Sequence, residues 1–192
     1  TLKVIAERAG FRHVSFQYEP LAAARAYEAK VNAETLALIC DIGGGTSDFS
    51  VIRLAPERRA APDSKDDILA NFGIRLGGTD LDRHLSLEAA MPMLGLGSRL
   101  HTKNLPMPRQ LFADLAHWPT INLLYTPESR RIVRELHADA VEPEKTARLK
   151  TVAEKHLGHR LAIAVEDAKI ALSAAPETAI EMGFIEPGLA AP

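Results

Sequence analysis

The chain has 192 residues, of which 46% are hydrophobic, and its 23 basic and 25 acidic residues leave a formal net charge of −2. This near-neutral balance, with no block of one sign, argues against a surface that binds nucleic acid or an anionic membrane. No apolar run is long enough to span a membrane, and the first residues lack the apolar core of a signal peptide. The single Cys40 excludes an internal disulfide. We therefore expect a globular, cytoplasmic protein.

The first residues are predicted to form two helices with a strand between them. Apolar spacing predicts a short helix that ends near Gly10, and alternation predicts a strand over 13–18. Pro20 then stands at the first turn of an Ala-rich segment, which predicts a helix that ends near Asn32.

Three apolar segments come next, and we interpret them as strands. They cover 36–40, 49–54 and 68–74. Cys40, inside the first of them, is expected to be a small buried side chain. The polar, Pro-containing segment 55–67 predicts an exposed loop before the last strand.

From about residue 79 onward the pattern predicts helices and loops. Prolines and glycines break 91–110 into loop. Thr126 is a suitable N-cap, and Pro127 suits the first position of the helix that follows. A second helical stretch continues to about residue 175 with an interruption at Gly158.

The last residues predict one further strand and a frayed tail. The alternating apolar residues of this strand are Ile180, Met182 and Phe184. Trp118 is expected to anchor the packing of the helical region. His156 and His159 are expected on the solvated surface, because no other ligand completes a metal set at suitable spacing.

The segment DIGGGTSD, at 41–48, joins the first two predicted strands. Backbone N–H groups in a Gly-rich turn form a concave cluster of donors that suits phosphate oxygens. The glycines Gly43, Gly44 and Gly45 permit positive φ and leave no Cβ to block a ligand. Thr46 can add a hydroxyl, and Asp41 can hold Mg²⁺ through water. A tight hairpin is the structural alternative, but it needs only about two special residues, so the pattern favours phosphate binding.

Four segments resemble the ATPase domain of heat shock protein 70 (DnaK-type) chaperones, which belong to the actin-like ATPase superfamily. In chain order they are YEPLAAARAY, DIGGGTSDFSVIRL, LGGTDLDRHL and VEDAKIALSAAPETAIEM. They cover roughly 1–84 and 160–185, whereas 85–159 does not align with the family. Two segments, FQYEPLAAARAYEA and HLGHRLAIAVEDAKIALS, are most similar to the bacterial YegD-like branch of the family, which lacks the peptide-binding domain.

The resemblance implies a site for ATP or ADP with Mg²⁺. It implies that Glu19 and Asp41 are catalytic carboxylates that hold the metal through water. It implies that the β- and γ-phosphates are held by Gly43, Gly44, Gly45 and Thr46, and that Gly77 and Gly78 lie beside the nucleotide. Asp48 points back into the hairpin, and a structural and a functional role are equally open for it.

The predicted helix near residue 166 carries a polar stripe. Glu166, Lys169 and Ser173 are spaced i, i+3 and i+7, so they share one face. Such a stripe is ordinarily a solvent face. The resemblance implies instead that it holds adenosine, with the acid and the amine on the ribose and the serine near the base. Ile170 stands where the family commonly has an arginine stacked on adenine, so a cation–π contact is lost.

The expected fold is α/β, with a ribonuclease-H-like (actin-like ATPase) subdomain and a mostly helical second subdomain. The resemblance assigns 1–31 to the end of lobe I and the interlobe helix. It assigns 32–83 to the ribonuclease-H-like part of lobe II, which carries the phosphate loop, and 84–192 to a helical subdomain of lobe II with the adenosine-type helix and a strand.

The expected function is nucleotide binding within an Hsp70-like chaperone ATPase. Its implied partners are the missing lobe I of a longer parent protein and protein clients or co-chaperones. The phosphate loop and lysine of the family's first lobe have no match here, so we expect weak or no ATP hydrolysis from this stretch alone. Two alternatives remain: a sugar- or acid-kinase-like ATPase of the same superfamily, and a non-enzymatic interaction module with a decayed nucleotide site.

Overall fold

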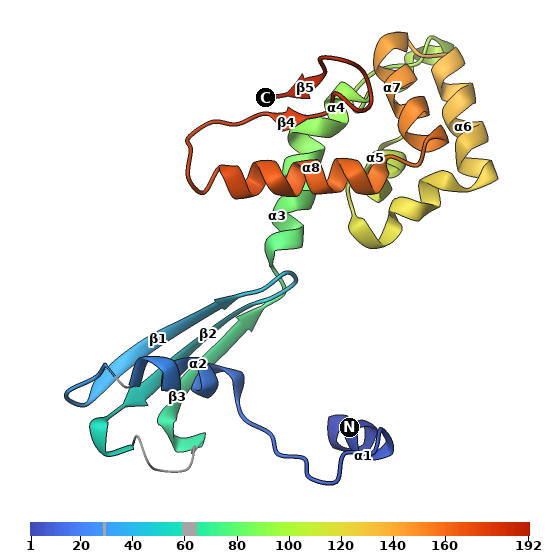
Figure 1. The fold of residues 1–192 in the computed structure, drawn as a ribbon. Coiled ribbons are helices and arrows are strands. Elements are labelled where there is room, and N and C mark those ends of the chain that lie inside the picture. Colours follow the sequence, from blue (N-terminus) through green and yellow to red (C-terminus); the bar gives the residue numbers. More distant parts are fainter. Residues whose placement is uncertain (29, 59–64) are drawn as a thin grey trace. The chain divides into compact units, whose positions relative to one another are not determined.

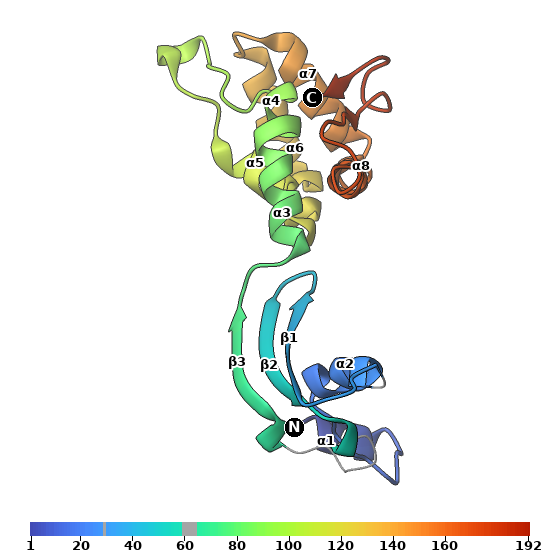
Figure 2. The same cartoon turned by 90° about the vertical axis from the view of Figure 1, so that its left-hand side faces the viewer.

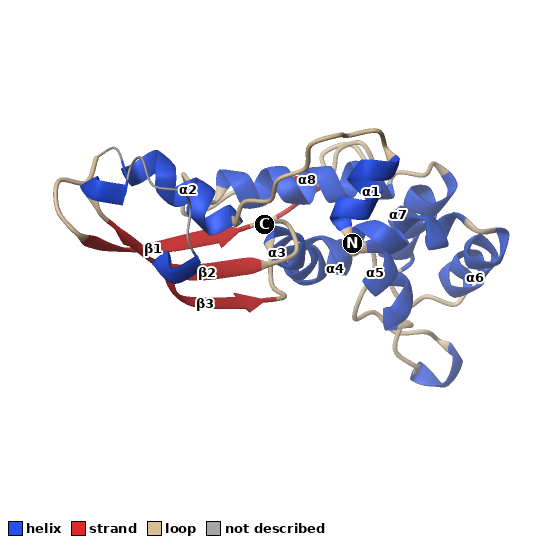
Figure 3. Cartoon of the chain, turned by 90° about the horizontal axis from the view of Figure 1, so that it is seen from below, coloured by secondary structure: helices blue, strands red, loops and turns tan. Residues whose placement is uncertain are grey.

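A computed structural model describes residues 1–28, 30–58 and 65–192 (Figure 1). The chain divides into two compact units, Thr1–Gly77 and Gly78–Pro192, and each is described by itself. Strands are concentrated in the first unit and helices in the second (Figure 3). The fold is therefore mixed α/β, as the sequence predicts.

The first unit is built on a three-stranded antiparallel sheet with the order β1-β2-β3. The strands are β1 (Thr35–Ile42), β2 (Ser47–Leu54) and β3 (Ile68–Ile74), which confirms the three predicted strands. A β-bulge between Val51 and Ile52 shifts the register of β2 against β3. Residues 59–64 of the predicted loop lie outside the described residues.

Helix α2 (Glu19–Glu28) packs against one face of this sheet (Figure 2). Leu21 and Ala24 of the helix contact Ile52 and Leu54 of β2 in a small buried cluster. The alternation of β2 provides this contact, because every second side chain of a strand points to the same face.

The opposite face of the sheet is apolar and exposed. On this face Leu38 of β1 pairs with Val51 of β2. Cys40 of β1 pairs with Phe49 of β2, which pairs in turn with Phe72 of β3. Leu38 is 63% exposed and Phe72 is 65% exposed. Cys40 lies on the same face and is exposed, which corrects the prediction of a buried thiol. The alternation in the sequence could not predict which face of the sheet α2 covers, because both faces of β1 carry apolar residues.

The residues before the sheet differ in part from the prediction. Helix α1 (Leu2–Arg8) forms as expected. The strand predicted over 13–18 is wrong, since this segment has no regular structure and Phe16 is 63% exposed. Alternation alone does not make a strand when no neighbouring strand supplies ladder hydrogen bonds. Helix α2 ends at Glu28, four residues before the predicted end at Asn32.

The second unit begins with a long helix that contains a π-helical segment. Helix α3 (Gly78–Leu85) continues through the π-helical residues Ser86–Ala90 into α4 (Met91–Met93). Pro92 therefore lies within helix, whereas the rest of the predicted loop over 91–110 is irregular, apart from a 3-10 turn at Thr102–Asn104 and the start of α5 at Arg109. A π segment changes the direction in which side chains leave a helix.

Four further helices complete the packing of the second unit. They are α5 (Arg109–Leu115), α6 (Pro127–Ala138), α7 (Pro143–Glu154) and α8 (Gly158–Ala171). Thr126 caps α6 as predicted, with its Oγ1 accepting a hydrogen bond of 3.1 Å from the Ser129 N–H. The predicted interruption at Gly158 is confirmed, because α8 begins there after His156 takes a φ of 55°.

The end of the chain is paired rather than frayed. Strand β4 (Ile180–Glu181) forms an antiparallel pair with β5 (Ala190–Ala191). The predicted strand is thus confirmed only at its start, and the frayed tail is wrong. The reason is packing: Ile180, Met182 and Ala191 are fully buried in the core of the second unit, with 2%, 0% and 0% of their surface exposed.

Candidate functional site

The glycine corner joins β1 to β2 through Gly43–Thr46. The Gly43 N–H donates a hydrogen bond of 2.9 Å to the Thr46 carbonyl, which closes the turn. Within the described residues, the N–H groups of Gly45 and Thr46 donate no hydrogen bond to the protein, and both residues are exposed. A Cβ built on Gly45 would meet no atom within 4 Å, so the Cα side of this residue is open to a ligand.

The glycines of the corner do not adopt the positive φ that the sequence suggested. Among described residues, the glycines with positive φ are Gly10, Gly95, Gly97 and Gly188, and none of them lies in the corner. The corner glycines therefore serve by having no side chain, which leaves the backbone open to approach.

Gly77 packs directly on this corner inside the first unit. A Cβ at Gly77 would collide with the backbone of Gly44 and Gly45. The neighbouring Leu76 carbonyl accepts a hydrogen bond of 2.7 Å from the Ser47 hydroxyl at the start of β2. The structure thus brings together two glycine segments that are 32 residues apart and that the sequence assigned separately to nucleotide binding.

Two carboxylates lie opposite each other at the base of the corner. Asp41 of β1 pairs with Asp48 of β2, and Asp48 pairs in turn with Gly73 of β3. The Asp48 side chain lies over Gly73, where a Cβ would displace it. Like charges directly opposite on adjacent strands are destabilising, so this pair favours a bound cation. From the sequence, a structural and a functional role were equally open for Asp48. A hairpin closed by the corner would already have predicted that Asp48 pairs with Asp41.

Glu19 is exposed in the first turn of α2. No described contact joins its carboxylate to Asp41 or Asp48. Among the described residues no group of three or more His, Cys, Asp or Glu side chains has the geometry of a metal cluster. The fit of a metal here therefore depends on the Asp pair together with water, and Mg²⁺ suits such a site because it retains several waters.

The polar stripe of α8 lies in the second unit and is partly engaged. Lys169 Nζ lies 2.7 Å from Asp82 Oδ1 and donates a hydrogen bond of 3.4 Å to the Gly78 carbonyl. The first contact is an ion pair without hydrogen-bond alignment, because Asp82 Oδ1 has no hydrogen-bond partner. Lys169 therefore fastens α8 to the first turns of α3. The sequence predicted no such role for Asp82, whose contact with Lys169 joins residues 87 positions apart.

The other stripe residues have different surroundings. Ile170 is 59% exposed. Ser173 lies beyond the last residue of α8, where its N–H donates a hydrogen bond of 3.0 Å to the Ile170 carbonyl. The helix ends two residues too early to hold Ser173 in the helical i+7 position relative to Glu166.

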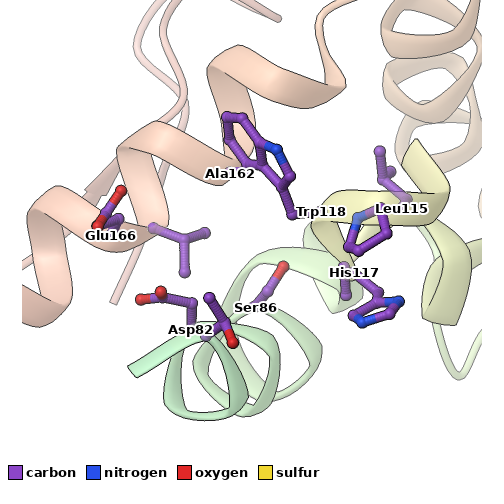
Figure 4. Close-up of a pocket in the computed structure, with 11 residues that line it drawn as sticks. Asp82, Ser86, Leu115, His117, Trp118, Ala162 and Glu166 are labelled. Carbon is purple, nitrogen blue, oxygen red and sulfur yellow. The ribbon is translucent and has the colours of Figure 1, made fainter. Parts of the chain in front are cut away.

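Glu166 lines a cavity of about 370 Å³ that lies wholly within the second unit (Figure 4). Asp82 and Ser86 of the α3 helix and Trp118 from the segment after α5 line it as well. Trp118 is 49% exposed, and its ring meets His159 edge-on at 4.9 Å between centroids. Trp118 therefore packs against its own unit, as the sequence predicts, and also forms part of the cavity wall.

The two histidines contact aromatic rings on this side of the unit. His156 stacks on Tyr125 with 4.3 Å between ring centroids. The Tyr125 hydroxyl accepts a hydrogen bond of 2.8 Å from the Gly158 N–H, and partial burial raises the pKa of Tyr125. His156 is exposed as predicted, whereas His159 is half-buried.

Comparison with known proteins gives partial matches to one kind of chaperone. No family model matches the chain. A chaperone protein HscA homolog from Vibrio atlanticus is 29% identical over 145 residues, which is 73% of this chain and 22% of that protein. The homolog from Pseudomonas fluorescens is 31% identical over 156 residues, 77% of this chain and 23% of that protein. The homolog from Pseudomonas putida is 38% identical over 99 residues, 51% of this chain and 15% of that protein.

The chain therefore spans less than a quarter of the length of these curated relatives. The matches support an Hsp70-like relationship, because HscA is a chaperone of the Hsp70 family. In the part of the chain that the structure describes, no helix is both long and apolar enough to cross a membrane.

Proposed function

We propose that this chain is a nucleotide-binding part of an Hsp70-like molecular chaperone ATPase, most similar to the YegD-like branch. In this proposal 1–31 is the end of lobe I with the interlobe helix, 32–83 is the ribonuclease-H-like part of lobe II, and 84–192 is its helical subdomain. The matches to HscA homologs support the family. The observation that carries the nucleotide assignment is the packing of Gly77 on the backbone of Gly44 and Gly45.

The phosphates would bind at Gly43–Thr46. The exposed N–H groups of Gly45 and Thr46 are suitable donors for phosphate oxygens, and the missing side chains let the ligand approach. Gly43 would contribute by shaping the turn, because its own N–H donates to Thr46.

A Mg²⁺ ion would neutralise the charge of the phosphates, and Asp41 and Asp48 would hold it through water. The support is the pairing of these carboxylates directly across β1 and β2. Glu19 would act from the first turn of α2 by accepting a hydrogen bond from a water of the metal shell.

The adenosine would bind along the stripe of α8. Glu166 and Lys169 would contact the ribose, Ser173 the base, and Gly77 and Gly78 would lie beside the nucleotide. Lys169 is already held by Asp82 and the Gly78 carbonyl, so its ammonium is positioned before the ligand binds.

Hydrolysis would need the rest of a longer protein. The exposed apolar face of the sheet, with Leu38 and Phe72, is the kind of surface that further polypeptide covers. We include the missing lobe I and protein clients or co-chaperones among the partners, place the protein in the cytoplasm, and expect this chain alone to be a weak ATPase or none. The kinase-like and interaction-module alternatives have no observation of their own in favour of them.

The phosphate site is tested by Gly44→Val in the longer parent protein. The added side chain should weaken Mg-ADP by at least about tenfold, since a hydrogen bond to a charged acceptor contributes about 1.5–3 kcal/mol. Calorimetric titration measures the affinity. Chemical shifts of amides 43–46 on adding Mg-ADP to the present chain provide an independent check. Unchanged affinity together with unchanged amides would favour the interaction-module alternative.

The adenosine site is tested by Ile170→Arg in the same protein. A guanidinium stacked on the base should tighten ADP by about 0.5–2 kcal/mol. Pyrophosphate should bind as before, because it lacks the base. Equal ADP affinity in the variant and the parent would contradict the adenosine site and favour the alternative that the stripe only faces solvent.

A further inference from the structure

The cavity of the second unit is enclosed by three separate parts of its fold. The long helix from α3 into the π-helical segment contributes Asp82 and Ser86, and α8 contributes Ala162, Val165 and Glu166. Leu115 and the segment 116–119 close the third side (Figure 4). Its volume of about 370 Å³ is in the range of small-molecule sites.

A buried hydroxyl points into this cavity. Ser86 is only 4% exposed and lines the cavity, and its Oγ is not among the buried side-chain atoms that lack a hydrogen-bond partner. It is the first residue of the π-helical segment, where the Met91 N–H donates to the Ser86 carbonyl five residues back. π segments frequently occur at functional sites. The Ser86 hydroxyl, on the wall of the cavity, is therefore a polar group with which a ligand in the cavity can form a hydrogen bond.

The charge at the cavity wall is negative. The carboxylate of Glu166, an exposed residue of α8, has no ion-pair or hydrogen-bond partner in the described part of the chain, whereas Asp82 is paired with Lys169 at 2.7 Å. The lining residues include His117 but no lysine or arginine. An anionic ligand would meet an unpaired carboxylate here, while a cation would neutralise it.

The remaining walls are apolar and aromatic. Leu115, Ala162 and Val165 provide aliphatic surface, and half-exposed Trp118 presents its ring beside Ala162 (Figure 4). An indole face attracts cations, and the aliphatic surface suits a hydrocarbon stem. We propose that this cavity binds an alkylammonium group, with the ammonium held by Glu166 and the Ser86 hydroxyl and the stem packed against Trp118.

The chain has one tryptophan, so its fluorescence reports on this cavity. We expect n-butylammonium to change the emission in a saturable way. The isosteres n-butanol and butyrate carry the same stem with a neutral or a negative head and should change it little. The same response to all three compounds, or no response to the amine, would overturn the proposal.

Variants identify the groups that hold the ligand. Glu166→Gln should weaken n-butylammonium by about tenfold or more, because the amide keeps an acceptor oxygen but loses the negative charge that strengthens a hydrogen bond to an ammonium. Asp167→Asn is the matched control: Asp167 is exposed, adjacent on α8 and outside the cavity lining, so its replacement should leave the affinity unchanged. Equal losses in the two variants would show a general charge effect and contradict the site.

Calorimetry with Trp118→Leu and Ser86→Ala completes the test without the fluorescent reporter. Both variants should bind the amine more weakly while their thermal unfolding stays close to that of the parent. Unchanged affinity in both would overturn the placement of the ligand in this cavity.

Two sources could supply the ammonium, and two probes separate them. Putrescine represents a free amine, and N-acetyl-lysine amide represents the side chain of a protein partner. The probe that binds more tightly identifies the source, and binding of neither contradicts the proposal. Mg-ADP is titrated separately: an amine that binds when ADP does not would leave this site standing while the nucleotide proposal fails.

Discussion

Replacing Gly158 with Val should lower the free energy of unfolding of the second unit by about 3 kcal/mol. A Cβ at this position would lie 2.6 Å from Ile121 Cγ2, 2.7 Å from the Tyr125 hydroxyl oxygen and 2.9 Å from Leu115 Cδ1. Ile121 and Leu115 are buried, so neither can move away without disturbing the core. Thermal or urea unfolding followed by Trp118 fluorescence measures the loss.

Gly183→Val is the matched control for this experiment. Gly183 lies in the same unit, and no atom lies within 4 Å of the Cβ that would be added. Its replacement should change the unfolding free energy by less than about 0.5 kcal/mol. Similar losses in both variants would mean that the tight packing around Gly158 is not the cause.

Replacing Gly77 with Val should weaken Mg-ADP by about a hundredfold in the longer parent protein, since each of the two proposed hydrogen bonds to the phosphates contributes about 1.5 kcal/mol or more. The new side chain collides with the backbone of Gly44 and Gly45, which cannot move aside by a rotamer change. The corner must therefore shift, and with it the donors proposed for the phosphates. Calorimetric titration with Mg-ADP measures the effect.

Gly45→Ala separates folding from binding at this corner. Its Cβ would meet no protein atom within 4 Å, so unfolding of the first unit should be unchanged. The same Cβ stands where the ligand is proposed to approach, so Mg-ADP should still bind more weakly. If Gly77→Val left Mg-ADP affinity intact, the packing of the two glycine segments would have no part in nucleotide binding.

Local chemistry in the sequence was sufficient for several elements. The three strands of the first unit follow from their apolar runs, and the cap at Thr126 follows from the Thr-Pro pair at the start of α6. The interruption at Gly158 follows from glycine between two helical patterns. These features depend on residues that are neighbours in the chain, so a short window of sequence contains their cause.

Other expectations failed because their cause lies between distant segments. The alternation at 13–18 has no strand to pair with, whereas the tail at 190–191 pairs with Ile180–Glu181. The exposure of Cys40 depends on which face of the sheet α2 covers. A hydrogen-bonded ladder and a covered face each need a second segment, which no local pattern specifies.

The same division applies to the candidate sites. The glycine corner and the stripe Glu166–Lys169 were predictable from the sequence, because residue type and spacing define both. Only the tertiary structure placed Gly77 on the corner, paired Lys169 with Asp82, and put Trp118 and Ser86 around one cavity. These contacts join residues far apart in the chain, and close packing of the folded chain, rather than local spacing, decides which of them meet.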